Sequence, residues 1–228
     1  MSMPAQVLPP ALREGDRLTR DEFLRRWDAM PDLKHAELIG GVVHMASPVS
    51  NPHGSPHMRL AFWLGLYGMH TPSIDGNANT TWLMSGDDVP QPDLAMRILP
   101  ECRGQSHDEG DYPAGAPELV VEISHATTSK DAGEKLRLYE RCGVREYLIA
   151  QTAKRRIVWR ELMDGKYREI APDADGVLRS RVFPGLWLDP DALWNGGFAG
   201  VAVAVQQGVA TSEHEAFVRE LETRMEAR

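Results

Sequence analysis

The middle of the chain is patterned as a strand, a helix and a second strand. Residues 118–124, Glu-Leu-Val-Val-Glu-Ile-Ser, form an apolar run with the length of a buried strand. Thr128 or Ser129 can cap the helix that follows, and Gly143 supplies a left-handed residue to end it. A second apolar run occupies 146–150. Since such a unit forms a right-handed crossover, the two strands are predicted to be parallel and to belong to one sheet.

An acidic residue, Glu122, lies inside the first of these strands. An ionised carboxylate left unpaired in a low-dielectric sheet costs several kcal/mol, so Glu122 is expected to be protonated, ion-paired or bound to a cation. Strand alternation places Glu122 and Ser124 on one surface. Helical periodicity places Lys135 at the rim of the buried face of the next helix, within reach of that surface. Two interpretations stay open: a buried Glu122–Lys135 ion pair, or part of a catalytic site.

A second acid, Asp93, follows a proline. Pro92 restricts the backbone and removes one donor, which suits a strand edge from which an acid is aimed into a cleft. A turn or a cap is the alternative for a Pro-Asp pair on its own. Two carboxylates with a nearby lysine are the groups of a divalent-metal site that hydrolyses a phosphodiester. Asp93, Glu122 and Lys135 are therefore the candidate site residues.

The remaining pattern predicts a mixed sheet within a single α/β domain. Gly40-Gly41 joins two apolar stretches within 36–45, and Asp164-Gly165 joins 156–162 to 167–170, so both segments are predicted to be hairpins. The other expected elements are a helix capped by Thr19 and ending near Met30, a helix at 57–69, strands at 80–84 and 93–99, a mobile loop at 102–116, and a last helix capped by Ser212. We expect a loose leader at 1–17, one domain at 18–195, and a small-residue linker with a C-terminal helix at 196–228.

Composition narrows the class of protein. With 228 residues, 42% of them hydrophobic, the chain can bury one substantial core. Its 33 acidic and 25 basic residues give a net charge of −8, which argues against a protein that coats nucleic acid through its overall field. Cys102 and Cys142 lack the spacing of a disulfide framework or a structural zinc site. Because no signal-like segment opens the chain and no run has the length of a membrane span, we expect a cytoplasmic protein without membrane contact.

Several common catalytic motifs are missing from the sequence. It has no HExxH, Walker, GxGxxG or GxSxG pattern, which argues against zincins, P-loop enzymes, dinucleotide-binding enzymes and serine hydrolases. His53 and His57 are four residues apart and would share the face of a helix. Pro52, Gly54 and Pro56 argue against a helix there, so the pair is predicted to be loop histidines rather than metal ligands.

The order of these motifs resembles the Uma-type putative restriction endonucleases, which belong to the PD-(D/E)XK nuclease superfamily. The segments that carry the resemblance are Glu37 to Val43, Ser47-Pro48, His53-Gly54, Pro92-Asp93, residues 118–124, Asp131 with Lys135, Leu136 and Tyr139, Gly143-Val144 with Glu146-Tyr147, Pro184 to Trp187, and Glu213-His214 with Phe217. They cover most of residues 18–221. The resemblance implies a restriction-endonuclease-like mixed sheet flanked by helices. It also implies hydrolysis of DNA phosphodiester bonds, with RNA not excluded.

The resemblance assigns roles to residues of this chain. Asp93 and Glu122 would ligate Mg²⁺, with Mn²⁺ as the alternative ion, and the backbone carbonyl of Ile123 would complete the protein ligands. The superfamily lysine normally lies two residues after the second acid, where this chain has Ser124. Lys135 would therefore be a lysine that has migrated to the helix, where it would orient a water or stabilise the developing anion.

Accessory features follow from the same resemblance. Glu37 would be an additional acid near the metal. His125 and Gln151 depart from the family pattern, in which a proline and an aspartate are usual. A homodimer is expected by analogy, because two strands require two cuts. The rival hypothesis is a catalytically silent nuclease fold that serves as an interaction or regulatory module, and the acidic net charge and Ser124 favour it.

Five basic residues are candidate nucleic-acid contacts, because an acidic chain must bind a polyanion through a locally basic surface. Arg137 and Arg141 are predicted to project from the solvent side of the Lys135 helix. Lys154, Arg155 and Arg156 follow the next strand. We expect the five to form one surface beside the metal cleft. The alternative for each group is a solvated helix face or turn.

Overall fold

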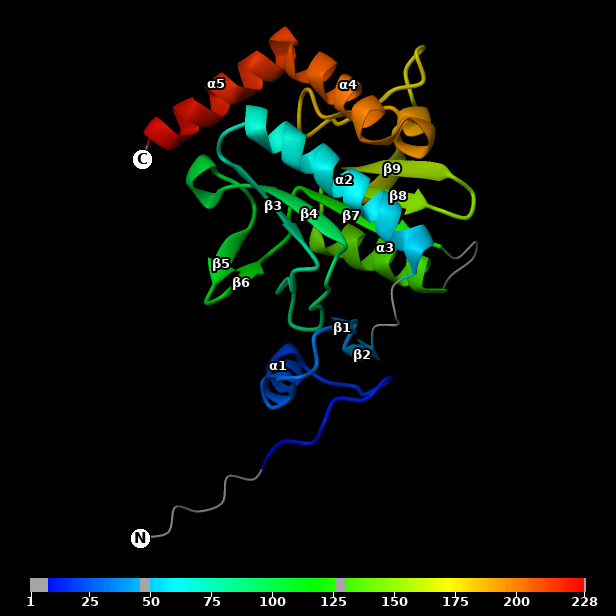
Figure 1. Cartoon of the computed structure of the whole chain (residues 1–228). Coiled ribbons are helices and arrows are strands. Elements are labelled where there is room, and N and C mark those ends of the chain that lie inside the picture. The colour runs from blue at the N-terminus through cyan, green and yellow to red at the C-terminus, as the bar shows by residue number, and fades with distance from the viewer. Residues whose placement is uncertain (1–7, 46–49, 126–129, 228) are drawn as a thin grey trace.

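A six-stranded sheet runs through the centre of the computed structural model, which describes residues 8–45, 50–125 and 130–227, without the side chains of 130–132 (Figure 1). The strand order is β10-β9-β8-β7-β4-β3. β7 and β8 are parallel, and the other neighbours are antiparallel, so the predicted mixed sheet and its crossover are confirmed. The strands are β3 (Ile74–Ala78), β4 (Leu94–Ile98), β7 (Leu119–Ser124), β8 (Glu146–Gln151), β9 (Arg156–Met163) and β10 (Lys166–Glu169).

Helices cover both faces of this sheet. On one face α2 (Asn51–His70) packs over β7, and α4 (Gly197–Val209) and α5 (Ser212–Glu226) complete the core that contains Leu119, Val121 and Ile123 of β7. On the other face α3 (Lys130–Cys142) packs over Val120, with Leu138 and Tyr139 in the same cluster. The alternation predicted for β7 is therefore confirmed, and it turns Glu122 toward α3.

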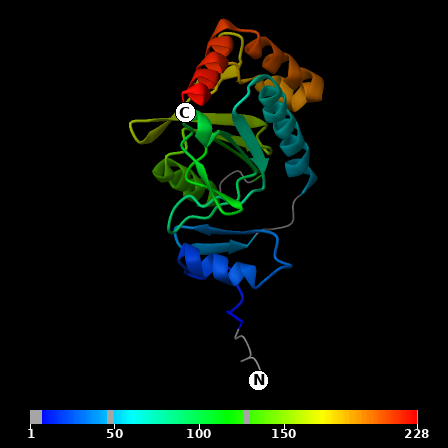
Figure 2. The same cartoon turned by 90° about the vertical axis from the view of Figure 1, so that its left-hand side faces the viewer.

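A smaller layer lies beyond one end of the sheet, on the side opposite α4 and α5 (Figure 2). It consists of α1 (Arg20–Asp28) and the antiparallel hairpin of β1 (Ala36–Ile39) and β2 (Val42–Met45). Gly40 and Gly41 have φ values of 57° and 74°, as a two-residue hairpin turn of the primed type requires. Leu38 pairs with Val89 in an isolated bridge, which attaches the hairpin to the segment between β3 and β4.

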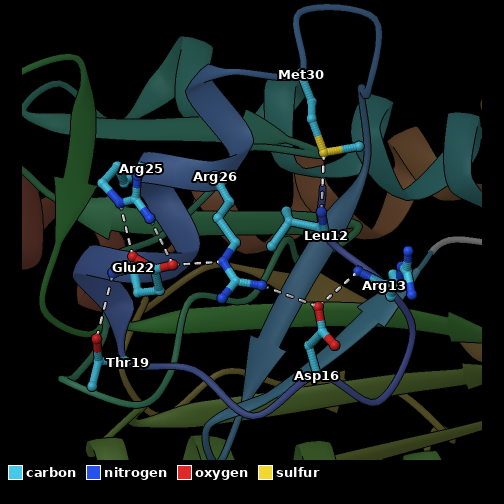
Figure 3. Close-up of polar contacts among 8 residues, drawn as sticks. All are labelled: Leu12, Arg13, Asp16, Thr19, Glu22, Arg25, Arg26 and Met30. Carbon is cyan, nitrogen blue, oxygen red and sulfur yellow. Dashed lines mark hydrogen bonds and ion pairs between the residues drawn. The ribbon is translucent and has the colours of Figure 1, made fainter. Parts of the chain in front are cut away.

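Residues 8–17, the described part of the segment predicted to be a loose leader, pack on this layer. Leu12 is buried, and the backbone of Asp16 accepts a hydrogen bond of 2.9 Å from the Val43 amide. Figure 3 shows Arg26 of α1 bridging Glu22 and Asp16, over 2.6 and 3.4 Å. A buried leucine and backbone pairing with β2 therefore outweigh the low periodicity of the sequence.

Helix α1 begins as predicted. The Thr19 hydroxyl accepts the Glu22 amide at 3.4 Å (Figure 3). The side chain of Glu22 binds Arg25 and Arg26 (Figure 3). Hydrogen bonds from those two guanidiniums lower the pKa of Glu22 to about 2.

Two predictions between α2 and β7 are wrong. The strand expected at 80–84 is absent, and the edge strand of the sheet is β3 instead. The Asp-Gly-Asn centre of β3 has no alternation of apolar and polar residues, and hydrogen bonding to β4 holds this strand in the sheet. Residues 102–116 do not form a mobile loop, because β5 (His107–Glu109) and β6 (Tyr112–Ala114) make a hairpin there. All three residues of β5 are exposed, so no apolar pattern marks it.

The C-terminal segment also differs from its prediction. The small-residue stretch after a single turn of π-helix at Ala192–Gly196 is not a linker but α4, whose Val201 and Val205 are buried in the main core. α5 is capped by Thr211, one residue before the predicted cap. A short pair, β11 (Leu178–Arg179) and β12 (Trp187–Leu188), precedes them. In the described part of the chain, no helix combines the length and apolar character that crossing a membrane requires.

Gly208 gives a direct test of how closely α4 packs. A Cβ at Gly208 would lie 2.1 Å from the carbonyl oxygen of Gly185, which itself has a φ of +87°. Since the two nearest atoms, at 2.1 and 2.9 Å, both belong to the Gly185 backbone, Gly208→Ala is expected to lower the free energy of unfolding by at least about 1–3 kcal/mol. Gly65→Ala in α2 meets no atom within 4 Å and serves as the control. Urea denaturation midpoints should fall for the first variant only; equal midpoints would contradict this packing.

Candidate active site

Asp93 lies where β4 meets β7. The antiparallel register pairs Leu94 with Val121, so Asp93 and Glu122 come next on the two strands. The carboxylate of Asp93 accepts the Ile123 amide at 2.6 Å. Burial opposes the ionisation of Asp93, but hydrogen bonds from His53 and from the Ile123 amide outweigh it, and the pKa of Asp93 is lowered. Asp93 is therefore a partly buried, ionised carboxylate beside the middle of the sheet.

Glu122 faces α3 from the neighbouring strand. Its Oε1 accepts hydrogen bonds from Lys135 Nζ at 2.9 Å and from the Tyr139 hydroxyl at 2.6 Å. Burial raises the pKa of Glu122 to about 7; the charge of Lys135 opposes this rise, and the carboxylates of Asp93 and Glu37 add to it. Sequence reasoning did not assign a role to Tyr139, although its position four residues after Lys135 puts both on one helix face.

Lys135 joins two carboxylates that are far apart in the sequence. Its Nζ lies 2.9 Å from Glu122 Oε1 and 2.9 Å from Glu37 Oε1. Burial alone would favour the neutral amine, but the two carboxylates outweigh it and raise the pKa of Lys135. Glu37 also accepts the Gln91 amide at 2.7 Å, so β1 contacts the segment that leads to Asp93. The structure thus brings Glu37, Glu122 and Lys135 into direct contact.

His53 and His57 are not loop histidines, and that prediction is wrong. α2 begins at Asn51, so both histidines lie in its first two turns and point to Asp93. His53 Nε2 is 3.1 Å from Asp93 Oδ1, and His57 Nε2 is 3.0 Å from the Asp93 carbonyl oxygen. Pro52 lies in the first turn of α2, where backbone amides have no carbonyl partner within the helix, so its missing amide costs no hydrogen bond. Pro56 lies inside the helix and is buried.

The two predicted basic groups lie at opposite ends of β8. Arg141 is near the end of α3, which leads into β8, and pairs with Asp88. Residues 154–156 follow the far end of that strand, where Arg155 donates to the Trp194 carbonyl at 3.0 Å and Arg156 pairs with Glu169 at 2.9 Å. Lys154 is exposed, as is Arg137. The structure therefore does not bring the five basic residues together in one surface.

Other predicted features lie outside what the structure describes. The Ser47-Pro48 segment and the helix cap at Thr128 or Ser129 fall in the two internal gaps. The side chain of Asp131 is among those that the structure does not describe.

The donors fit a hard divalent cation, although no cluster of three or more His, Cys, Asp or Glu side chains among the described residues forms a ready-made metal cage. Mg²⁺ keeps several waters and needs only one or two protein carboxylates. The site contains Glu37, Asp93 and Glu122 against one lysine, and this excess of negative charge helps to raise the pKa of Glu122. Both hydrogen bonds to the Glu122 side chain end on Oε1. Asp93 and Glu122 are therefore suitable ligands for an added cation.

Comparison with known protein families gives a match. The sequence matches the family described as Uma2, putative restriction endonuclease, over residues 20–191, which is more than half of the chain. The chain belongs to this family. The Uma2 match contains the four acidic and basic site residues and both histidines of α2, whereas α4 and α5 lie beyond it.

The fold has a counterpart among solved structures. A crystal structure of a putative nuclease of DUF820 from Anabaena variabilis ATCC 29413 is similar with a TM-score of 0.59 and 15% sequence identity, over 81% of this chain and 99% of that one. A search among curated proteins gave no match. The central mixed sheet of this Uma2 family member, with helices on both faces, is thus a nuclease-like fold.

Proposed function

We propose that this chain is a metal-dependent endonuclease that hydrolyses DNA phosphodiester bonds. The observation that carries the proposal is the contact of Lys135 with Glu122. Glu122 and Asp93 are neighbours on adjacent strands, because each lies next to the Leu94–Val121 pair in the register. Asp93 and Glu122 would hold Mg²⁺ or Mn²⁺, together with the carbonyl oxygen of Ile123. When bound, the cation would lower the pKa of a water and neutralise charge on the phosphate. Membership of a putative endonuclease family supports the same reaction class.

The residues of the chain divide the remaining work. The protonated amine of Lys135 is held by ion pairs with Glu37 and Glu122. A positive charge therefore stays fixed near the developing anion. Tyr139 and Lys135 hold one oxygen of Glu122 and orient the other. His53 and the Ile123 amide fix the carboxylate of Asp93. A preorganised set of this kind needs little rearrangement during the reaction.

The test of this function is incubation of the wild-type protein with duplex DNA, single-stranded DNA and RNA, with and without Mg²⁺ or Mn²⁺. Metal-dependent cleavage of DNA is the expected result, and Glu122→Gln is the inactive control. We also propose a homodimer, which sedimentation during the same experiments would detect. Cleavage that persists with a chelator, or is equal in the control, would contradict the proposal.

A silent interaction module is the alternative function. It is favoured by the ion-pair network itself, in which Lys135 satisfies two carboxylates without any cation. A protein that cleaves none of the substrates with either metal, while melting as one folded unit, would select this alternative.

His53 provides a prediction about the neighbours of the metal ligands. His53→Ala removes one donor to the carboxylate of Asp93 without removing a carboxylate. Groups that orient ligands typically contribute 10–100-fold, so metal affinity and cleavage are expected to fall by about that factor. His35→Ala, at an exposed position, is the control. Calorimetric titration with Mn²⁺ measures the change; unchanged affinity in the His53 variant would show that Asp93 does not depend on α2.

A further inference from the structure

A hollow of about 290 Å³, lined by both elements, lies where the β1–β2 hairpin meets α3. Arginine dominates its charged lining, which consists of Arg17, His44, Glu134, Arg137 and Arg141. Three of these residues share one face of α3 because they are spaced i, i+3 and i+7. Arg17 comes from the segment before α1 and is held there by a backbone bridge to Val42. Three separate parts of the chain thus build one basic concavity.

The charges of the hollow are only partly balanced. Arg141 pairs with Asp88, and Glu134 adds one further carboxylate. His44 Nδ1 lies 3.5 Å from Glu14 Oε1. Among the residues that the structure describes, neither Arg17 nor Arg137 makes an ion pair or a side-chain hydrogen bond. Two arginines without a partner in the lining of one hollow leave it with positive charge that an anion would balance. This excess of positive charge stands out in a chain with a net charge of −8.

The hollow borders the candidate active site along two elements. On α3, Arg137 comes two residues after Lys135. On β1, Ile39 of the hollow comes two residues after Glu37, on the same side of the strand and about 7 Å further along it. A strand of nucleic acid that lies at Lys135 therefore passes close to this hollow.

We propose that the hollow binds a phosphate of the nucleic-acid strand away from the scissile position, through Arg17 and Arg137. This inference rests on the proposed nuclease function. A guanidinium offers a planar fork of donors that matches phosphate oxygens in a bidentate way. The hollow replaces the single basic surface predicted from the sequence, because residues 154–156 lie beyond the other end of β8. Arg17 is a contact that sequence reasoning missed.

The test compares two double variants in DNA binding. One combines Arg17→Gln with Arg137→Gln. The matched control combines Arg168→Gln with Arg219→Gln, which are exposed arginines on β10 and α5 outside the lining of the hollow. Fluorescence anisotropy of a labelled duplex, without added metal so that no cleavage occurs, gives the affinity over a series of salt concentrations. Two lost phosphate contacts should reduce the slope of log affinity against log salt by about 1.8 in the first variant only. With metal added, that variant should show a higher KM at an unchanged kcat.

The outcomes separate this inference from the nuclease proposal. A reduced slope in the first variant supports the hollow even if the wild type cleaves nothing, in which case only the nuclease proposal fails. Equal slopes in both variants, with a wild type that cleaves DNA, overturn the hollow and leave the nuclease proposal intact. Inorganic phosphate is the second probe: if it stabilises the wild type and not the first variant in thermal melts while the DNA slopes are equal, the hollow binds free phosphate and the inference is wrong. A wild type that binds no DNA at low salt also overturns it.

Discussion

Lys135→Met is expected to abolish cleavage and to destabilise the protein at the same time. The change leaves the buried carboxylate of Glu122 and the half-buried carboxylate of Glu37 without their shared cation. Breaking a buried ion pair in this way costs about 3–5 kcal/mol, which should appear as a lower free energy of unfolding at neutral pH. Loss of one group that stabilises a developing anion typically costs about 10²–10³-fold in kcat, and we expect at least that.

Added metal separates the catalytic role of Lys135 from a structural one. If Asp93 and Glu122 bind Mg²⁺, the cation replaces part of the missing positive charge, so saturating Mg²⁺ should raise the melting temperature of the Lys135→Met variant toward that of the wild type. Cleavage should remain absent under those conditions. Full recovery of cleavage along with stability would mean that Lys135 is only a counter-ion. Lys135→Arg, which keeps the charge, is the control for folding.

Glu122→Gln is expected to remove activity with a smaller loss of stability. The glutamine carbonyl can accept the hydrogen bonds of Lys135 and Tyr139, and Lys135 keeps its ion pair with Glu37. A metal ion contributes several kcal/mol of charge stabilisation, so loss of a ligand should lower kcat by at least about 10³-fold. Magnesium binding measured by calorimetry should weaken in parallel.

A second buried carboxylate of the same sheet supplies the matched control for this variant. Glu118 precedes β7 and accepts the amides of Ile98 and Gln105, at 2.8 and 3.0 Å. It contacts none of the site residues named above, so Glu118→Gln should retain metal binding and kcat. If Glu118→Gln and Glu122→Gln lose activity equally, the loss reflects a damaged sheet and not a lost ligand.

The central part of the site could be predicted from local sequence patterns. Alternation along β7 and the helical phase of α3 are both short-range properties, and together they place Glu122 opposite Lys135. The observed distance of 2.9 Å between Glu122 Oε1 and Lys135 Nζ agrees with that expectation. The glycines at Gly40 and Gly143 also take the positive φ values that their turns require.

The neighbours of Asp93 could not be predicted in the same way. His53 reaches Asp93 across 40 residues, and prolines at 52 and 56 suggested a loop where α2 begins. Amides in the first turn of a helix have no carbonyl partner within the helix, so Pro52 removes no hydrogen bond there. A proline therefore destabilises a helix only at positions beyond the first turn. Glu37 reaches Lys135 from a hairpin that the bridge between Leu38 and Val89 holds in place, and such long-range pairing leaves no periodic signal in the sequence.

The most direct test of the metal site is a crystal structure of the wild-type protein soaked with Mn²⁺, with the ion located by its anomalous signal. A single peak is expected between the carboxylates of Asp93 and Glu122, within coordination distance of an oxygen of each, with Lys135 nearby. An occupied Mn²⁺ site elsewhere, with Asp93 still bound only to His53 and Ile123, would contradict it.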